Sequence, residues 1–138
     1  MKILSTPKAF TLMEIMIVVI IMGIMAAFAI PNYGKSVAQT YLQDAIIQLS
    51  AIRTANQVYF ARTSSYWPNS GETHGVDEIN TALSLNLIEN GLKYNCAAGA
   101  PATYSCTATR LGTSTFTVTI TQAALSDTNP ACTAGSCP

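Results

Sequence analysis

The feature that most constrains this chain is an uncharged run of sixteen residues, Ile15 to Ile30, which ends at Pro31. With residues 10–13 in front of it, the apolar span reaches about 20 residues, roughly what a helix needs to cross ~30 Å of hydrocarbon. Glu14 lies inside this span. A carboxylate costs about 3 kcal/mol near the bilayer centre and less near an end. The sequence therefore predicts a membrane-embedded helix, with Glu14 as a functional group that needs a cationic partner.

The side chains of the same chain are poor partners for Glu14. Lys8 lies on the far side of Phe10, and the next base, Lys35, is about 30 Å further along the helix. Cleavage just before Phe10 would create a nearer cation, because the freed α-amine has a reference pKa of about 7.7–8.0. We therefore expect processing to create the partner.

The segment from Lys8 to Glu14, K-A-F-T-L-M-E, with a short basic leader before it and an apolar helix after it, resembles the class III signal of type IV prepilins and pseudopilins. The likeness covers about residues 7 to 35. It implies that prepilin peptidase cuts between Ala9 and Phe10 and methylates the new amine of Phe10. It also implies that Glu14 neutralises this amine on a neighbouring subunit during assembly. The family usually has glycine before the cut, and Ala9 is a small substitute for it.

The resemblance assigns residues 1–9 to a cleaved leader and residues 10–31 to the transmembrane and filament-core half of a long helix. In assembled filaments of the family, the stretch matching Gly23 to Pro31 loses helical order. The residues agree, since glycine and proline both lower helix stability. A conventional signal peptide cleaved near residues 26–29 is the alternative, and it leaves Glu14 unexplained.

The charged residues predict the orientation of the chain in the membrane and argue against one class of function. Lys2 and Lys8 favour a cytoplasmic N-terminus, which places the rest of the chain outside. The whole chain has seven basic and seven acidic residues, so removal of these two lysines leaves five against seven, a side-chain balance of −2. Strong electrostatic binding of nucleic acid is therefore not expected.

Beyond the membrane segment, the helical period continues over residues 32–62. Apolar residues recur at steps of three and four, and the polar residues, Asn56 among them, fall mainly elsewhere. The apolar positions are Leu42, Ala45, Ile46, Leu49, Ile52 and Tyr59. A helix from Phe10 to about Arg62 would be ~80 Å long, which exceeds any bilayer. Its outer half needs a cover, and residues 63–138, here called the globular cap, supply it.

The sequence of the globular cap predicts a loop followed by strands. Residues 66–84 are polar and rich in turn residues, with a helical turn near residues 77–85. Strands are predicted at residues 93–96, 103–110 and 113–121, the last with apolar and threonine residues in alternation. An antiparallel sheet of three or four strands against the helix would bury both apolar faces. The predicted fold class is therefore α+β, with a long N-terminal helix packed on a small antiparallel sheet.

Four cysteines lie in the predicted external part, and they allow three pairings. Cys96 with Cys106 would link neighbouring strands, and Cys132 with Cys137 would close a small ring in the tail. A zinc site is the alternative, but no C-x2-C spacing occurs and His74 is the only imidazole, so disulfides are favoured. We interpret His74 as a solvated loop residue, Trp67 as a packing residue, and Asp77 with Glu78 as a solvated acidic face.

No pattern for an enzyme, a metal site or a cofactor is recognised. Three functions follow from the resemblance. The first is a structural subunit of a type IV pilus, in the inner membrane before assembly and then in a surface filament for adhesion, motility or DNA uptake. Its implied partners are identical or homologous subunits, prepilin peptidase and the inner-membrane assembly machinery. The alternatives are a pseudopilin of a type II secretion system and a minor pilin that binds DNA or another ligand.

Overall fold

The computed structural model describes residues 10–69, 71–99, 103–112, 115–123, 129–135 and 137. The chain divides into two compact units, Met1–Ser36 and Val37–Pro138. The predicted leader, residues 1–9, lies outside the described residues. So do residues 113 and 114, with which the third predicted strand was expected to begin.

A single long helix, α1, runs from Leu12 to Thr63 and passes from the first unit into the second. The predicted end near Arg62 is confirmed to within one residue. The helix stops where Ser64 takes a positive φ of 57°, while the amide of Ser64 still donates to the carbonyl of Phe60 at 2.8 Å. Residues other than glycine rarely adopt this left-handed backbone conformation, and the regular helical geometry of α1 ends at this residue.

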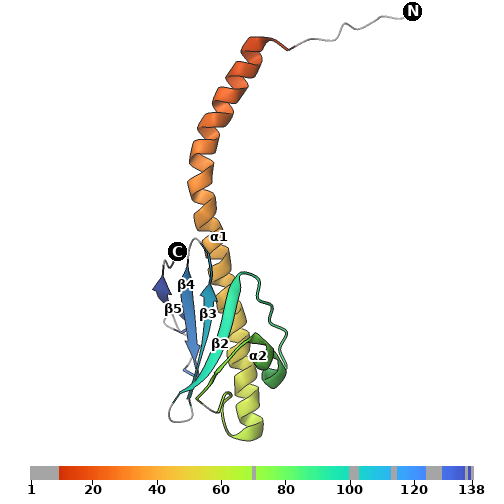
Figure 1. Ribbon diagram of the computed structural model, residues 1–138, viewed down its shortest axis with the longest axis vertical. Coiled ribbons are helices and arrows are strands. Elements are labelled where there is room, and N and C mark those ends of the chain that lie inside the picture. Colours follow the sequence, from red (N-terminus) through yellow and green to blue (C-terminus); the bar gives the residue numbers. More distant parts are fainter. Residues whose placement is uncertain are drawn as a thin grey trace, which may run out of the picture. The chain divides into compact units, whose positions relative to one another are not determined.

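The second unit contains an antiparallel sheet beside the outer part of α1 (Figure 1). Its strands follow in chain order, each hydrogen-bonded to the next. They are β1 (Thr73–His74), β2 (Leu92–Gly99), β3 (Thr103–Arg110), β4 (Phe116–Thr121) and β5 (Ala131–Gly135). The α+β fold is confirmed, but the expectation of three or four strands was wrong, because β1 and β5 add an edge strand on each side.

The core forms where the sheet, α1 and the short helix α2 (Val76–Leu83) meet. Ala45, Leu49 and Ile52 of the predicted helix stripe are buried, and the other three predicted positions are partly buried. Inward-facing residues of the strands complete this core: Leu92, Tyr94, Cys96, Tyr104, Cys106, Ala108, Phe116, Val118 and Ile120. Each large apolar side chain buried in this way contributes about 1.5–3 kcal/mol, so the sheet and the outer half of α1 stabilise each other.

One residue of α1 departs from the predicted pattern. Asn56 was placed on the polar side of the helix, but it is 0% exposed. Its side-chain oxygen accepts the backbone N–H of Trp67 at 2.8 Å, and its side-chain nitrogen donates to the carbonyl of the same residue. The Asn56 amide therefore supplies the hydrogen-bond partners that the buried backbone N–H and carbonyl of Trp67 need. Its own burial is tolerated because both of these hydrogen bonds are made. Trp67 is itself buried, which confirms its predicted packing role.

Candidate functional site

The helix α1 begins with a reciprocal set of hydrogen bonds between Thr11 and Glu14. The backbone N–H of Thr11 donates to Oε2 of Glu14 at 2.9 Å, and the Thr11 hydroxyl donates to the same oxygen at 3.0 Å. In return, the backbone N–H of Glu14 donates to the Thr11 hydroxyl oxygen at 3.2 Å. This is a capping box, in which two side chains satisfy amides that a helix start leaves without partners. Glu14 thus has a structural role that was not predicted from the sequence, although the Thr-x-x-Glu spacing is typical of a capping box.

The capping box leaves part of the Glu14 carboxylate open. Both hydrogen bonds from Thr11 go to Oε2, and no basic side chain among the described residues forms an ion pair with Glu14. The adjacent Phe10 is 81% exposed. Oε1 can therefore accept a further donor at the very start of the helix.

Every large apolar side chain between Leu12 and Phe28 is exposed, from 46% for Val18 to 78% for Leu12. Exposed apolar side chains lie on all sides of the helix, as they do in a helix that is surrounded by lipid or by other apolar helices. A surface of this size in water would favour association. This part of α1 therefore requires a cover of lipid or of other apolar helices.

Among the described residues, no single helix is long and apolar enough to count as a membrane span. The segments Leu12–Phe28 and Tyr33–Thr63 pass the same criteria of length and composition only together, as a pair bent by 42°. Gly23 lies within the first part, and a Cβ added to it would contact nothing within 4 Å. Pro31 lies between the two parts. The predicted loss of helical order from Gly23 to Pro31 stays a prediction.

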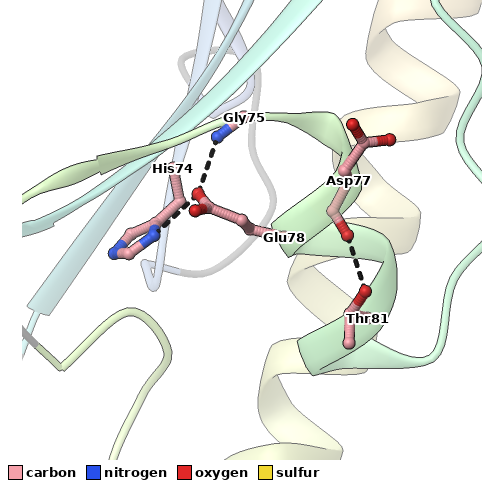
Figure 2. A network of polar contacts seen from close by, with 5 residues as sticks. All are labelled: His74, Gly75, Asp77, Glu78 and Thr81. Carbon is pink, nitrogen blue, oxygen red and sulfur yellow. Dashed lines mark hydrogen bonds and ion pairs between the residues drawn. The ribbon is translucent and has the colours of Figure 1, made fainter.

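In the globular cap, His74 was expected to be solvated, and this expectation was wrong. Its side chain is 19% exposed, and its Nδ1 lies 2.9 Å from Oε2 of Glu78. The same oxygen accepts the backbone N–H of Gly75 at 3.2 Å, as Figure 2 shows. Glu78 is 61% exposed and stands in the first turn of α2, with Gly75 as the residue before that turn. The glutamate therefore joins β1 to the start of α2.

All four cysteines are paired. Cys96 bonds to Cys106 across β2 and β3, and Cys132 bonds to Cys137 in the C-terminal segment. The preference for disulfides is confirmed, with the connectivity in which near neighbours in sequence pair. No thiolate remains for the zinc alternative, and the described residues contain no group of three metal-ligating side chains.

Comparisons with known proteins agree with the features at the helix start. Residues 5–30 match the prokaryotic N-terminal methylation motif. The chain is 41% identical over 83 residues to the type IV major fimbrial protein FimA of Dichelobacter nodosus, which covers 58% of this chain and 51% of FimA. It is 36% identical over 89 residues to the type IV major pilin protein PilE of Neisseria gonorrhoeae, which covers 62% and 53%.

A fimbrial protein of Pseudomonas aeruginosa is 48% identical over 52 residues, which are 38% of this chain and 34% of that protein. The chain thus spans about half or less of the length of these relatives. No solved structure gives a significant match. The matched motif, residues 5–30, contains the capping box and the exposed apolar part of α1 up to Phe28.

Proposed function

We propose that this chain is a type IV pilin and a structural subunit of a type IV pilus, because residues 5–30 match the N-terminal methylation motif and its relatives are named as type IV pilins and fimbrial proteins. The observation that carries the proposal is the first part of α1, which is apolar and exposed on all sides and has a single carboxylate at its start. Such a helix is suited to a filament core made of many copies, where each helix covers its neighbours. The relatives named as major pilins and fimbrial proteins favour the pilus over a secretion pseudopilus.

The first step in this proposal is processing. The chain is inserted with the leader in the cytoplasm, and α1 from Phe10 onward enters the inner membrane. Prepilin peptidase then removes residues 1–9 by a cut between Ala9 and Phe10 and methylates the Phe10 amine. The matched motif, whose description refers to N-terminal methylation, spans this position.

The second step is assembly, in which Glu14 has two roles. Oε2 keeps the capping box with Thr11, and Oε1 accepts the charged amine of Phe10 from a neighbouring subunit. The ion pair offsets the cost of a carboxylate in an apolar environment. Helices are thereby added one at a time to the filament, which extends from the inner membrane to the cell surface.

Substitutions at Glu14 separate these two roles. Glu14→Gln keeps an acceptor for the capping box but removes the charge, whereas Glu14→Ala removes both. Thr11→Val is the matched control, because it removes the hydroxyl bonds and keeps the charge. We expect both Glu14 variants to enter the membrane and to yield at least tenfold fewer sheared surface fibres, and Thr11→Val to assemble. Normal fibres from Glu14→Gln would refute the ion pair as the basis of assembly.

A further inference from the structure

The loop that connects α2 to β2 contains the pair Asn90–Gly91, the only asparagine–glycine pair in the chain. Asn90 is exposed, and its side-chain amide forms no hydrogen bond with another described residue. Its backbone N–H donates to the carbonyl of Ile88 at 3.0 Å, which turns the chain just before β2. Because an asparagine side chain is short, it reaches the backbone of the residues that follow it in a turn. The Asn90 amide is therefore free to approach the backbone nitrogen of Gly91.

Gly91 leaves that nitrogen accessible. It has a positive φ of 74°, and a Cβ added to it would lie 3.1 Å from Cε1 of Tyr41. Residues with a side chain rarely adopt this conformation, so the position is suited to glycine. Gly91 also precedes the first residue pair of the β2–β3 ladder, which is Leu92 with Arg110. Neither a side chain of its own nor a place in the ladder shields the Gly91 nitrogen from the Asn90 amide.

Asn86, in the same loop, provides a contrast. It is also exposed, and its side-chain amide also forms no hydrogen bond with another described residue. The residue that follows it is Leu87, which is buried and whose backbone N–H donates to the side-chain oxygen of Asn80 at 2.7 Å. The backbone nitrogen after Asn86 is therefore both covered and hydrogen-bonded, which distinguishes Asn86 from Asn90.

We propose that Asn90 is a site of spontaneous deamidation, in which water is the only co-reactant. The backbone nitrogen of Gly91 loses its proton to solvent base and attacks Cγ of Asn90. A new C–N bond closes a succinimide ring, the bond between Cγ and the side-chain nitrogen breaks, and that nitrogen takes up a proton and leaves as ammonia. Water then adds to one of the two ring carbonyls and opens the ring. One water is consumed, one ammonia is released, and nothing is oxidised or reduced.

The carbonyl that water attacks decides the product. Attack at Cγ breaks its bond to the Gly91 nitrogen and gives aspartate, with the normal backbone. Attack at the backbone carbonyl gives isoaspartate, in which the chain continues through Cγ. Both products add a negative charge next to Glu89, and isoaspartate also lengthens the backbone where Gly91 lies against Tyr41. Direct hydrolysis of the side-chain amide would give aspartate alone, so isoaspartate identifies ring closure.

The test is a timed incubation of the purified full chain in detergent micelles, followed by peptide mass spectrometry. Deamidation raises the mass of a peptide by about 1 Da, and chromatography separates the aspartate and isoaspartate forms. A sample digested at time zero gives the background. We expect Asn90 to be modified at least about tenfold faster than Asn86, the reference within the same molecule. Both products should appear at Asn90, and the rate should rise from neutral to mildly alkaline pH, because the attacking nitrogen must lose its proton.

Two variants complete the test. Asn90→Gln keeps a side-chain amide at this exposed position but lengthens the side chain by one carbon, so ring closure is disfavoured and the peptide should keep its mass. Asn86→Gln is the matched control and should leave the rate at Asn90 unchanged. The proposal fails if Asn90 of the wild-type chain is modified no faster than Asn86, or if aspartate forms there without isoaspartate. Both of these results are read from the wild-type chain, so they do not depend on the folding of a variant.

Discussion

At the scale of single residues, some contacts can be predicted from local spacing and others cannot. Glu14 reads in the sequence as a charge without a partner, and the structure adds the capping box with Thr11. The Thr-x-x-Glu spacing could have predicted the box, since both residue types and their separation are local. Asn56 could not be predicted in this way. Its partner, the backbone of Trp67, is eleven residues away, and helical periodicity contains no information about where a loop returns.

We expect Asn56→Leu to lower the free energy of unfolding by about 3 kcal/mol, because the backbone N–H and carbonyl of Trp67 would stay buried without partners. Gln57→Ala, at the exposed neighbouring position, should change it by less than about 0.5 kcal/mol. Denaturant titration of the full chain in micelles, followed by circular dichroism, measures both. Equal stability of Asn56→Leu and wild type would show that this amide does not hold the loop.

The helices and strands follow the sequence signals to different degrees. The end of α1 and the central strands β3 and β4 could be predicted, because long periodic segments such as Phe116–Thr121 specify both type and face. The edge strands could not. β1 has two residues, and β5 has the sequence A-C-T-A-G, in which small residues give little strand signal. Both depend on pairing with β2 and β4, which a local pattern does not contain.

Two buried tyrosines, Tyr94 in β2 and Tyr104 in β3, should make the protein less stable at alkaline pH. Burial raises the pKa of Tyr94 to about 12, with Asp44 and Glu89 adding to the effect. Burial also raises the pKa of Tyr104 to about 12, against a lowering by Arg53. A raised pKa means that the folded state holds its proton more tightly. The stability from this source is therefore complete below about pH 10, the unfolded value, and falls as pH rises from about 10 to 12.

The measurement is the free energy of unfolding across pH 8 to 12 for wild type, Tyr94→Phe and Tyr104→Phe. Each substitution should reduce the decline above about pH 10. Neither should cost much at pH 8, because the two hydroxyls have no hydrogen-bond partner among the described residues. An identical alkaline decline in all three proteins would contradict this assignment.

The whole molecule consists of two units that differ in how their apolar side chains are buried. Unit Val37–Pro138 contains its own core, whereas the large apolar side chains of α1 from Leu12 to Phe28, in unit Met1–Ser36, are exposed. The fold class could be predicted because a long helix with an apolar stripe and a one-sided sheet have few ways to bury both. What buries the exposed apolar side chains in the first part of α1 could not be predicted from a single chain. In the proposed pilus, other copies of the same helix provide it.

The most direct test of the pilus proposal is mass spectrometry of surface fibres sheared from the native cells. We predict that this chain is a constituent of the fibres, that its N-terminus is Phe10, and that the Phe10 amine is methylated. Fibres without this chain, or a mature chain that still begins at Met1, would contradict the proposal.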